Sequence, residues 1–202
     1  RRQHHPVGGG HPDCRRAAHH HVPNGTGNGR GILVFEIALL VGKQALENVK
    51  IAVEVAQQAA DASGLDPASL PSVFTSGMAD VKTTDIICRA LAAPQKIISP
   101  THFHNSVHNA SSGYWSIAAA CHERSNSVSG FRHSFGIALL ESAVLCQTEG
   151  KPVMLVACDI ATEPPLDAIC PIAGPFGIAL VLAPAGADGV ASIRLSLEPS
   201  QG

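Results

Sequence analysis

A surplus of charge of one sign is the first feature that the sequence lacks. Its 202 residues include 14 Lys and Arg against 16 Asp and Glu, which gives a formal net charge of −2. Proteins that bind nucleic acids or anionic membranes through their surfaces need an excess of basic side chains. The composition therefore predicts neither kind of partner.

Long hydrophobic runs, paired cysteines and nucleotide-binding motifs are missing as well. The longest apolar run, residues 31–41, is interrupted by Glu36 and is much shorter than the roughly 20 residues of a membrane helix. The six cysteines are widely spaced and form no C-x-x-C pair, so neither a zinc knuckle nor a disulfide scaffold is expected. No glycine-rich phosphate-binding motif follows a strand pattern, so no cofactor is expected. These absences predict a cytoplasmic protein with reduced thiols and no membrane insertion.

Aromatic residues are scarce, at 4% of the chain, while 45% of the residues are hydrophobic and 15% are charged. This balance is typical of helices packed on a sheet rather than of a small all-β barrel. The hydrophobic pattern predicts helices over residues 47–62, 80–93 and 133–150, and strands over residues 71–76, 125–131, 152–159 and 175–184. Alternating strands and helices imply right-handed crossovers. The predicted fold is therefore a layered α/β fold with a mixed, mostly parallel sheet between helices.

Residues 1–30 differ in composition from the rest of the chain. They contain six His, six Gly and three Pro without periodicity, and Gly and Pro at this density resist both helix and strand. We therefore expect an irregular N-terminal arm over residues 1–30, followed by a single domain over residues 31–202. Because a loose arm orders metal ligands poorly, no dedicated metal site is expected there. The histidines of the arm are His4, His5, His11, His19, His20 and His21.

Residues 99–117, SPTHFHNSVHNASSGYWSI, concentrate polar side chains and contain the only Trp and Tyr of the chain. Zinc binds imidazole, and this segment carries His102, His104 and His108. The last two would share a helical face if Asn105 opened a helix. No carboxylate or Cys lies close enough in sequence to complete a site, and Asn is a poor zinc ligand. No metal site is therefore assigned, and a metal-binding module at the three histidines is kept as an alternative.

A structural interpretation of the same segment is favoured. Backbone groups in a loop need polar side chains as hydrogen-bond partners, and this segment is rich in them. The aromatic pair at its end is suited to packing a helix onto the sheet. The polar residues concerned are His104, Asn105, His108 and Asn109, and the packing residues are Gly113, Tyr114 and Trp115.

Four segments, GLDPASLPSVFTSG, SPTHFHNSVHNASSGYWSI, SFGIALLESA and KPVMLVACD, can be compared as a set. Together they resemble the β-ketoacyl synthase N-terminal-like family over about residues 49–184. The resemblance implies a thiolase fold related to the first half of a ketosynthase. The family includes chain-length-factor-like subunits encoded with aryl polyene and related polyketide or fatty-acid pathways. The resemblance therefore implies a heterodimer with a ketosynthase subunit, through which the chain would meet an acyl carrier protein.

The resemblance also bears on catalysis. Thiolase-fold ketosynthases carry their nucleophilic Cys where a buried strand meets a long helix, because the helix N-terminus stabilises a thiolate. In SNSVSGFRHSFGIALLE this position falls on Arg132, where the family usually has an acidic residue, and Arg cannot be acylated. The resemblance thus implies a subunit that is not catalytic alone and that pairs through the strand near residues 127–131, closing off an acyl tunnel. The expected interface or tunnel residues are His104, Asn105, His108, Asn109, Phe131, Arg132 and His133.

Cys121 is the basis of an enzymatic alternative. The run AAACHERS superficially resembles the Ala-Cys of a ketosynthase turn, and His122 and Glu123 follow the Cys. In this alternative the chain is an active β-ketoacyl-acyl-carrier-protein synthase, or another acyltransferase or thioester hydrolase. Sequence neighbours do not make a catalytic dyad, however, and Cys121 falls at the end of a helical segment, before the strand that leads to the turn. A structural thiol is the favoured interpretation.

Overall fold

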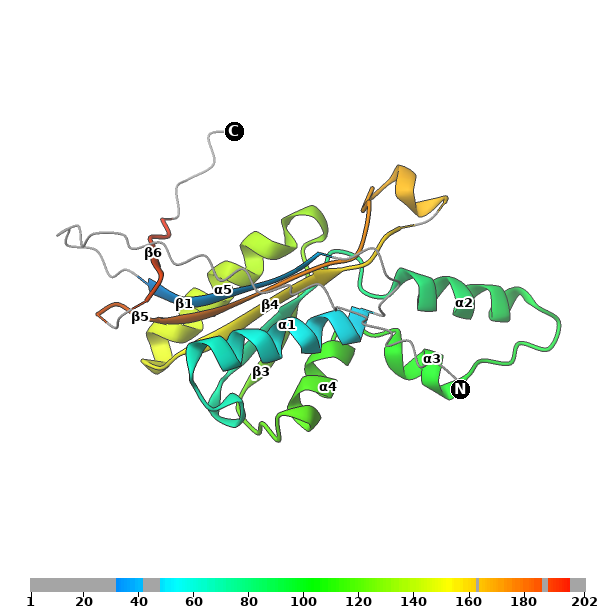
Figure 1. The fold of residues 1–202 in the computed structure, drawn as a ribbon. Coiled ribbons are helices and arrows are strands. Elements are labelled where there is room, and N and C mark those ends of the chain that lie inside the picture. The colour runs from blue at the N-terminus through cyan, green and yellow to red at the C-terminus, as the bar shows by residue number, and fades with distance from the viewer. Residues whose placement is uncertain (1–31, 42–47, 163, 187–188, 197–202) are drawn as a thin grey trace, which may run out of the picture.

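The computed structural model describes residues 32–41, 48–162, 164–186 and 189–196 (Figure 1). Its strands are β1 Ile32–Val41, β2 Ser72–Thr75, β3 Ser125–Val128, β4 Val153–Asp159, β5 Phe176–Pro184 and β6 Ala191–Ile193. Within the described residues they form one sheet, in the spatial order β3, β2, β4, β5, β1, β6. The arm expected over residues 1–30, with its six histidines, lies outside the described residues.

Strand direction divides the sheet into two parts. β2 pairs in parallel with β3 and with β4, and β4 pairs antiparallel with β5. Two of the three pairs in this four-strand part are parallel, which confirms the predicted mixed, mostly parallel arrangement. Beyond β5, strands β1 and β6 are added by antiparallel pairing. Because β2, β3 and β4 run in the same direction, Thr75, Val128 and Asp159 end them on one side of the sheet, called here the carboxyl end.

The apolar run that sequence analysis considered only as a membrane-span candidate forms strand β1. This strand lies between β5 and β6, and its register pairs Ile32 with Pro184 and Val41 with Phe176. The register shifts between Val34 and Glu36. In the part of the chain that the structure describes, every helix is too short or too polar to cross a lipid bilayer.

The helices are α1 Asn48–Ser63, α2 Val81–Ala92, α3 Pro100–Asn105, α4 Ala110–Ala118 and α5 Ser134–Glu149. The helices predicted over residues 47–62, 80–93 and 133–150 are confirmed as α1, α2 and α5, each to within one residue at either end. Local chemistry explains two of these boundaries. Asp80 accepts a hydrogen bond from the Thr83 amide at 2.9 Å and so caps α2. Gly150 ends α5 in the left-handed region, with φ of 66°.

Helices cover both faces of the sheet (Figure 1). α1 and α4 lie on one face, where Met154 and Val156 of β4 join their core. α5 lies on the other face, where Val153 and Leu155 join a second core. Side chains alternate along a strand, so β4 contributes to both cores. The layered α/β class is therefore confirmed.

Gly177 allows α1 to lie close against β5. A Cβ atom at this position would be 2.5 Å from Ile51 Cγ2 and 3.1 Å from Val55 Cγ1. Both of these α1 side chains are fully buried. Because a packed core has little free space, a side chain at residue 177 would push α1 away from the sheet.

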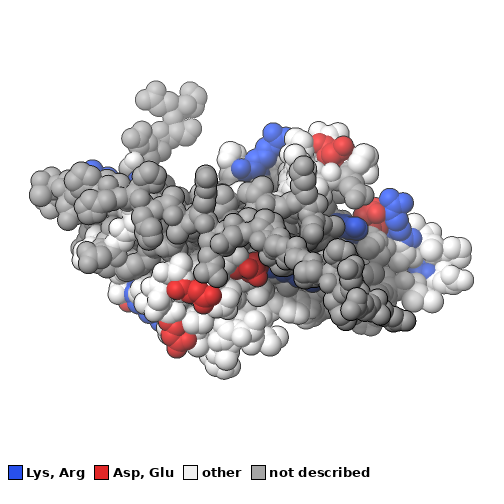
Figure 2. Space-filling model, in the orientation of Figure 1, with Lys and Arg blue, Asp and Glu red and all other residues white. Residues whose placement is uncertain are grey.

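Charged side chains are spread over the face shown in Figure 2. Among the described residues on that face, Lys and Arg lie in small groups near Asp and Glu, and neither sign forms a continuous patch. Within α2, Arg89 Nε is 2.6 Å from Asp85 Oδ2. Figure 1 shows that α2 and α3 project beyond the sheet, and only Val81 and Thr83 of α2 are buried.

Candidate functional site

The turn between β3 and α5 lies at the carboxyl end of the sheet and is built around Ser134. This buried serine accepts a hydrogen bond from the Gly130 amide at 3.0 Å and donates one to the Phe131 carbonyl at 2.7 Å. The two bonds hold a short 3₁₀ helix, Phe131–His133, directly before α5. Phe131 has φ of 54°, a left-handed conformation that is unfavourable for a bulky side chain. The turn is therefore sharp and strained.

Arg132 lies in this strained turn, one residue after Phe131. Its Nη2 atom donates a hydrogen bond of 2.8 Å to the carbonyl of Ile169, which belongs to the loop between β4 and β5. The guanidinium carbon also lies 5.6 Å from the centre of the Phe131 ring, within the range of a cation–π contact. Arg132 thus joins the start of α5 to the loop that connects two neighbouring strands.

A second polar group at the carboxyl end is centred on Asp159, the last residue of β4. Its Oδ1 atom accepts hydrogen bonds from Ser76 Oγ at 2.6 Å and from the Gly77 amide at 2.9 Å. Ser76 Oγ accepts in turn from the Ala79 amide at 2.8 Å, and the Ser76 carbonyl accepts from Ser129 Oγ at 2.9 Å. The carboxylate is therefore engaged in holding the loop after β2. Sequence analysis did not single out this residue, although an acidic residue at the end of an otherwise apolar strand was a visible signal.

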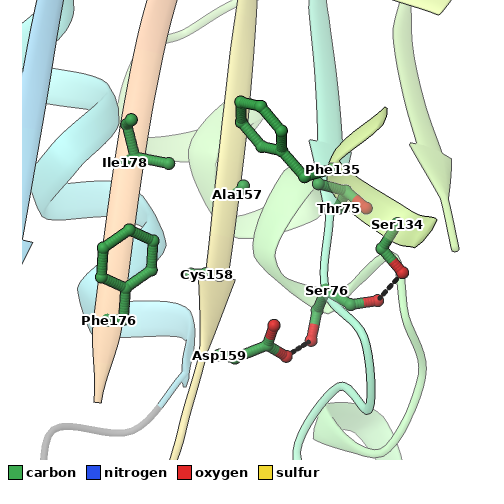
Figure 3. A pocket seen from close by; sticks show the side chains of 9 residues that line it. All are labelled: Thr75, Ser76, Ser134, Phe135, Ala157, Cys158, Asp159, Phe176 and Ile178. Atoms are coloured by element: carbon green, nitrogen blue, oxygen red, sulfur yellow. Dashed lines mark hydrogen bonds between the residues drawn. The ribbon is translucent and has the colours of Figure 1, made fainter. Parts of the chain in front are cut away.

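A cavity of about 260 Å³ opens between these groups and α5 (Figure 3). Its wall includes Phe135 from the first turn of α5, Phe176 and Ile178 from β5, and Ala157 from β4. Figure 3 shows the two aromatic rings on opposite sides of the opening. The complete lining is Thr75, Ser76, Ser134, Phe135, Ala157, Cys158, Asp159, Phe176 and Ile178.

Cys158 is the cysteine that borders this cavity. It is 3% exposed, and burial, assisted by the negative charge of Asp159, raises the pKa of its thiol to about 12. Only the thiolate is a good nucleophile, and at neutral pH such a thiol stays protonated. Cys158 is therefore not equipped for acyl transfer.

Cys121 lies at the opposite, amino end of the sheet. The structure places it between α4 and β3, a whole element before the turn, as expected from its position in the sequence. It is 6% exposed, and its Sγ donates to the carbonyl of Leu70 at 3.5 Å. Glu123 is paired with Lys151 at 2.7 Å rather than with the thiol. The sequence run around Cys121 therefore does not fold into a catalytic dyad.

In the histidine segment, the condition for a shared helical face is not met. Asn105 does not open a helix: it ends α3, and α4 begins only at Ala110. His104 and His108 consequently do not lie one turn apart on a common helix. Among the described residues no group of three His, Cys, Asp or Glu side chains is placed to hold a metal ion, so the structure does not support the alternative of a metal site at His102, His104 and His108.

The same segment divides into a buried part and a surface part. Trp115 is fully buried and packs in the core between α4 and α1, as expected. Tyr114, by contrast, is 37% exposed; its hydroxyl donates to Asn105 Oδ1 at 3.1 Å, and its ring meets His104 edge-on at 5.7 Å. Asn109 precedes α4, but its side chain makes no capping hydrogen bond. A surface groove of about 290 Å³ is lined by His104, Val107, Asn109, Ala110, Gly113, Tyr114 and Ile117.

The parallel core of the sheet and the sharp strand-to-helix turn define a thiolase-like fold of the ketosynthase type. The chain belongs to the family described as β-ketoacyl synthase, N-terminal domain, whose model matches residues 40–200. No curated protein matches the chain.

Solved structures support the fold. A structure of a ketosynthase in complex with its chain length factor from Xenorhabdus doucetiae matches with a TM-score of 0.64 and 20% identity, covering 76% of this chain and 79% of that one. The ishigamide ketosynthase/chain length factor matches with a TM-score of 0.55 and 13% identity, covering 68% and 44%. A 3-oxoacyl-(acyl carrier protein) synthase III from Pseudomonas aeruginosa PAO1 matches with a TM-score of 0.51 and 12% identity, covering 78% and 53%. The chain thus spans about half the length of the last two proteins.

Proposed function

We propose that this chain is a non-catalytic, chain-length-factor-like partner of a β-ketoacyl-acyl-carrier-protein synthase in polyketide or fatty-acid-type biosynthesis, such as that of aryl polyenes. The observation that carries the proposal is Arg132 at the strand-to-helix turn, hydrogen-bonded to Ile169. Two of the similar structures are, by their titles, complexes or pairs of a ketosynthase and a chain length factor. We place the role in a single cytoplasmic domain over residues 31–202.

The chemistry at the carboxyl end supports a non-catalytic role. Arg132 keeps its positive charge at any physiological pH and offers no lone pair for attack on a thioester. Cys158, whose Sγ is shielded from water, stays protonated because burial raises the pKa of its thiol to about 12. Cys121 lies at the other end of the sheet and donates its hydrogen bond to a backbone carbonyl. None of these three side chains can act as an acyl acceptor in its present setting.

Strand β3 is the surface through which we propose that the partner binds. It is the end strand of the sheet, and within the described residues only β2 pairs with it. The free side of such a strand presents unpaired backbone groups that can accept a strand from another chain. Asn126 donates to Glu141 of α5 at 2.7 Å, and the Ser127 and Ser112 hydroxyls lie 3.1 Å apart, so α5 and α4 both flank this strand.

Apolar side chains extend the proposed interface on either side of β3. Ile117 of α4 is 81% exposed, and Leu140 and Val144 of α5 are 36% and 51% exposed. Large apolar side chains that gather beside a free strand are typical of protein interfaces. In the proposal they contact the ketosynthase, and the acyl carrier protein reaches this chain only through the complex.

The remaining residues of the proposed interface or tunnel lie in two places. One group lines or adjoins the groove on α3 and α4, and the other forms the strained turn before α5. Their bulk would limit the length of the growing acyl chain at the subunit boundary. The residues are His104, Asn105, His108 and Asn109 in the first group and Phe131, Arg132 and His133 in the second.

Co-expression with a ketosynthase encoded beside this chain tests the proposal. We expect the two to co-purify at a ratio of one to one, and Ile117→Glu to remove the ketosynthase because a charge would be buried against the partner. Ala62→Glu, on the exposed face of α1, is the matched control and leaves the complex intact. A stable chain that never binds a ketosynthase, or an Ile117→Glu variant that still binds it, would contradict the proposal.

A further inference from the structure

Residues 97–122, which contain α3 and α4, form a segment without charged side chains. No Lys, Arg, Asp or Glu occurs in it, although these residue types make up 15% of the whole chain. Among the described residues, the three most exposed large hydrophobic side chains also lie here: Ile97 at 77%, Phe103 at 65% and Ile117 at 81%. Exposed apolar surface that lacks charge is typical of a surface that another protein covers.

The groove on α3 and α4 lies within this segment. The residues that α4 contributes to its lining are Ala110, Gly113, Tyr114 and Ile117. They follow the i, i+3, i+4, i+7 spacing that places residues on one face of a helix. Trp115 of the same helix is fully buried and packs in the core with α1. The groove therefore opens on the side of α4 that the core of this chain does not use.

Gly113 is the unusual residue of this groove. It lies inside α4, where glycine is less favourable for the helix than alanine. The packing of this chain does not require it, because the residue is exposed and a Cβ atom there would have no described neighbour within 4 Å. Glycine is suited to positions where another group must approach the backbone closely. The open space over Gly113 therefore indicates room for a group from outside this chain.

Tyr114 gives the groove a wall that is already ordered. Its hydroxyl donates to Asn105 Oδ1 at 3.1 Å, and its ring meets the ring of His104 edge-on at 5.7 Å between centres. Both contacts join α4 to α3, so the wall is held in place by this chain alone. A preformed wall lowers the ordering cost of binding, and aromatic side chains are enriched in protein interfaces.

We propose that this groove receives one large apolar side chain of the ketosynthase, which lies over Gly113 beside Tyr114 and Ile117. This contact rests on the proposed function, since it belongs to the same interface. The groove volume of about 290 Å³ lies just below the ~300 Å³ at which small-molecule pockets usually begin, which suits a single anchoring side chain.

Charge and position both favour this occupant. The lining contains no Lys, Arg, Asp or Glu, so a charged side chain would lose its hydration there without gaining an ion-pair partner. The groove also adjoins the proposed β3 interface, because the hydroxyls of Ser112 in α4 and Ser127 in β3 lie 3.1 Å apart. A partner that pairs with β3 could therefore reach the groove as part of one continuous surface.

Filling the groove from within this chain tests the contact. The affinity of the full chain for the ketosynthase encoded beside it is measured by calorimetric titration, and thermal unfolding is followed for each free variant. Gly113→Ala should weaken binding about three- to tenfold and Gly113→Leu at least about 30-fold, because the added side chain displaces the anchor. Both free variants should be at least as stable as the wild type, since Ala and Leu favour a helix more than Gly and meet open space. Ala62→Leu, on the exposed face of α1, is the matched control and should leave the affinity unchanged.

Three results would overturn the proposed contact. Wild-type affinity in Gly113→Leu would refute this contact but leave the proposed function standing, because the complex itself would still form. A loss of stability in the free Gly113→Ala variant would show that the glycine serves the fold of this chain instead. Failure of the wild-type chain to bind the ketosynthase would refute the contact together with the proposed function.

Discussion

At the carboxyl end of the parallel strands a half-buried carboxylate accepts hydrogen bonds from a loop, whereas at the amino end half-buried carboxylates pair with cations. Asp159 accepts hydrogen bonds from Ser76 and Gly77 at 2.6 and 2.9 Å. At the amino end Lys151 lies 2.7 Å from Glu123, and Arg124 lies 3.0 Å from Glu149, all with partly exposed side chains. The two ends therefore use the same functional group in different ways. Internal hydrogen bonds organise a loop, while exposed ion pairs contribute little to stability.

The carboxyl end also contains the features that a purely structural end of a sheet would not need. A cavity opens there, and Thr75 leaves a buried hydroxyl without a partner in the described part of the chain. The amino end buries Cys121, but its thiol has the Leu70 carbonyl as a partner. Unmet polar groups and open volume tend to occur where a protein binds something. Gln147 Nε2, in the last turn of α5 near the amino end, is likewise buried without a partner among the described residues, so the cavity rather than the unpaired hydroxyl distinguishes the carboxyl end.

The largest expected effect comes from removing one carboxylate at each end. Asp159→Ala would leave the Ser76 hydroxyl and the Gly77 amide without their acceptor, and we expect it to lower the free energy of unfolding by about 3 kcal/mol. Glu123→Ala, which breaks an exposed pair with Lys151, should lower it by less than about 1 kcal/mol. Urea denaturation of both variants measures the difference. Equal losses would mean that the two ends are energetically alike.

The extent to which the sequence predicts the structure differs between these regions. Periodicity predicted α1 well because helical contacts are local and an apolar stripe repeats every few residues, whereas α5, which has apolar residues on all sides, was recognised as a long apolar segment ended by Gly150. The condition that Asn105 opens a helix is not met, and Pro100 after Ser99, a typical helix start, indicates a helix that ends rather than begins near Asn105.

Contacts between distant residues were harder to predict. The hydrogen bond between Ser76 and Asp159 joins residues 83 positions apart, so no local pattern reveals it. Strand β1 was not identified because periodicity alone does not distinguish a strand from a buried helix in a long apolar run, and its partner β5 is far away in sequence. The cavity likewise depends on where α5 begins relative to three strand ends. Such features can be predicted only when the register of the whole sheet is known.

The next expected effect is a pH dependence with a contribution from each end, because Cys158 lies near the carboxyl end and Cys146 lies in the last turn of α5, near the amino end. Burial raises the pKa of the Cys158 thiol to about 12 and that of the Cys146 thiol to about 11, from the ordinary value of 9.0. A raised pKa means that the folded state keeps its proton longer, so stability is complete below pH 9 and falls as the pH rises above it. We expect the free energy of unfolding to fall with a slope approaching about 1.4 kcal/mol per pH unit for each thiol.

Denaturation at pH 8, 9 and 10 checks this dependence. Cys158→Ala removes one of the two thiols, so its stability should decline less steeply over the same range, whatever its stability at pH 8. An identical slope in wild type and variant would show that the Cys158 thiol ionises as readily when folded as when unfolded.

A smaller effect concerns backbone strain, which occurs at both ends. Phe131 at the carboxyl end and Ala120 at the amino end have φ of 54° and 48°. Glycine adopts this region without the Cβ clash, so Phe131→Gly should be about 1 kcal/mol more stable than Phe131→Ala, a control that loses the ring but keeps the strain. Ala120→Gly should be stabilised to a similar degree. Thermal unfolding of the three variants measures these differences in stability. If glycine stabilises the protein at residue 131 and not at residue 120, backbone strain is confined to the carboxyl end.

The last prediction is that Cys121 is not acylated and that its substitution has no effect on condensation. This thiol is 6% exposed and donates to the Leu70 carbonyl, at the end of the sheet opposite the strand-to-helix turn. After incubation with acyl-carrier-protein thioesters, with and without the ketosynthase, mass spectrometry should detect no acyl adduct on any Cys of this chain. A complex of the ketosynthase with the Cys121→Ser variant should condense substrate at the same rate as the complex with the wild-type chain. An adduct at Cys121 that disappears in Cys121→Ser would instead make the amino end the reactive one. That result would make the amino end the reactive end and the carboxyl end the structural one. It would also require the Cys121 thiol to break its hydrogen bond to Leu70 and to be exposed by movement of the residues that bury it.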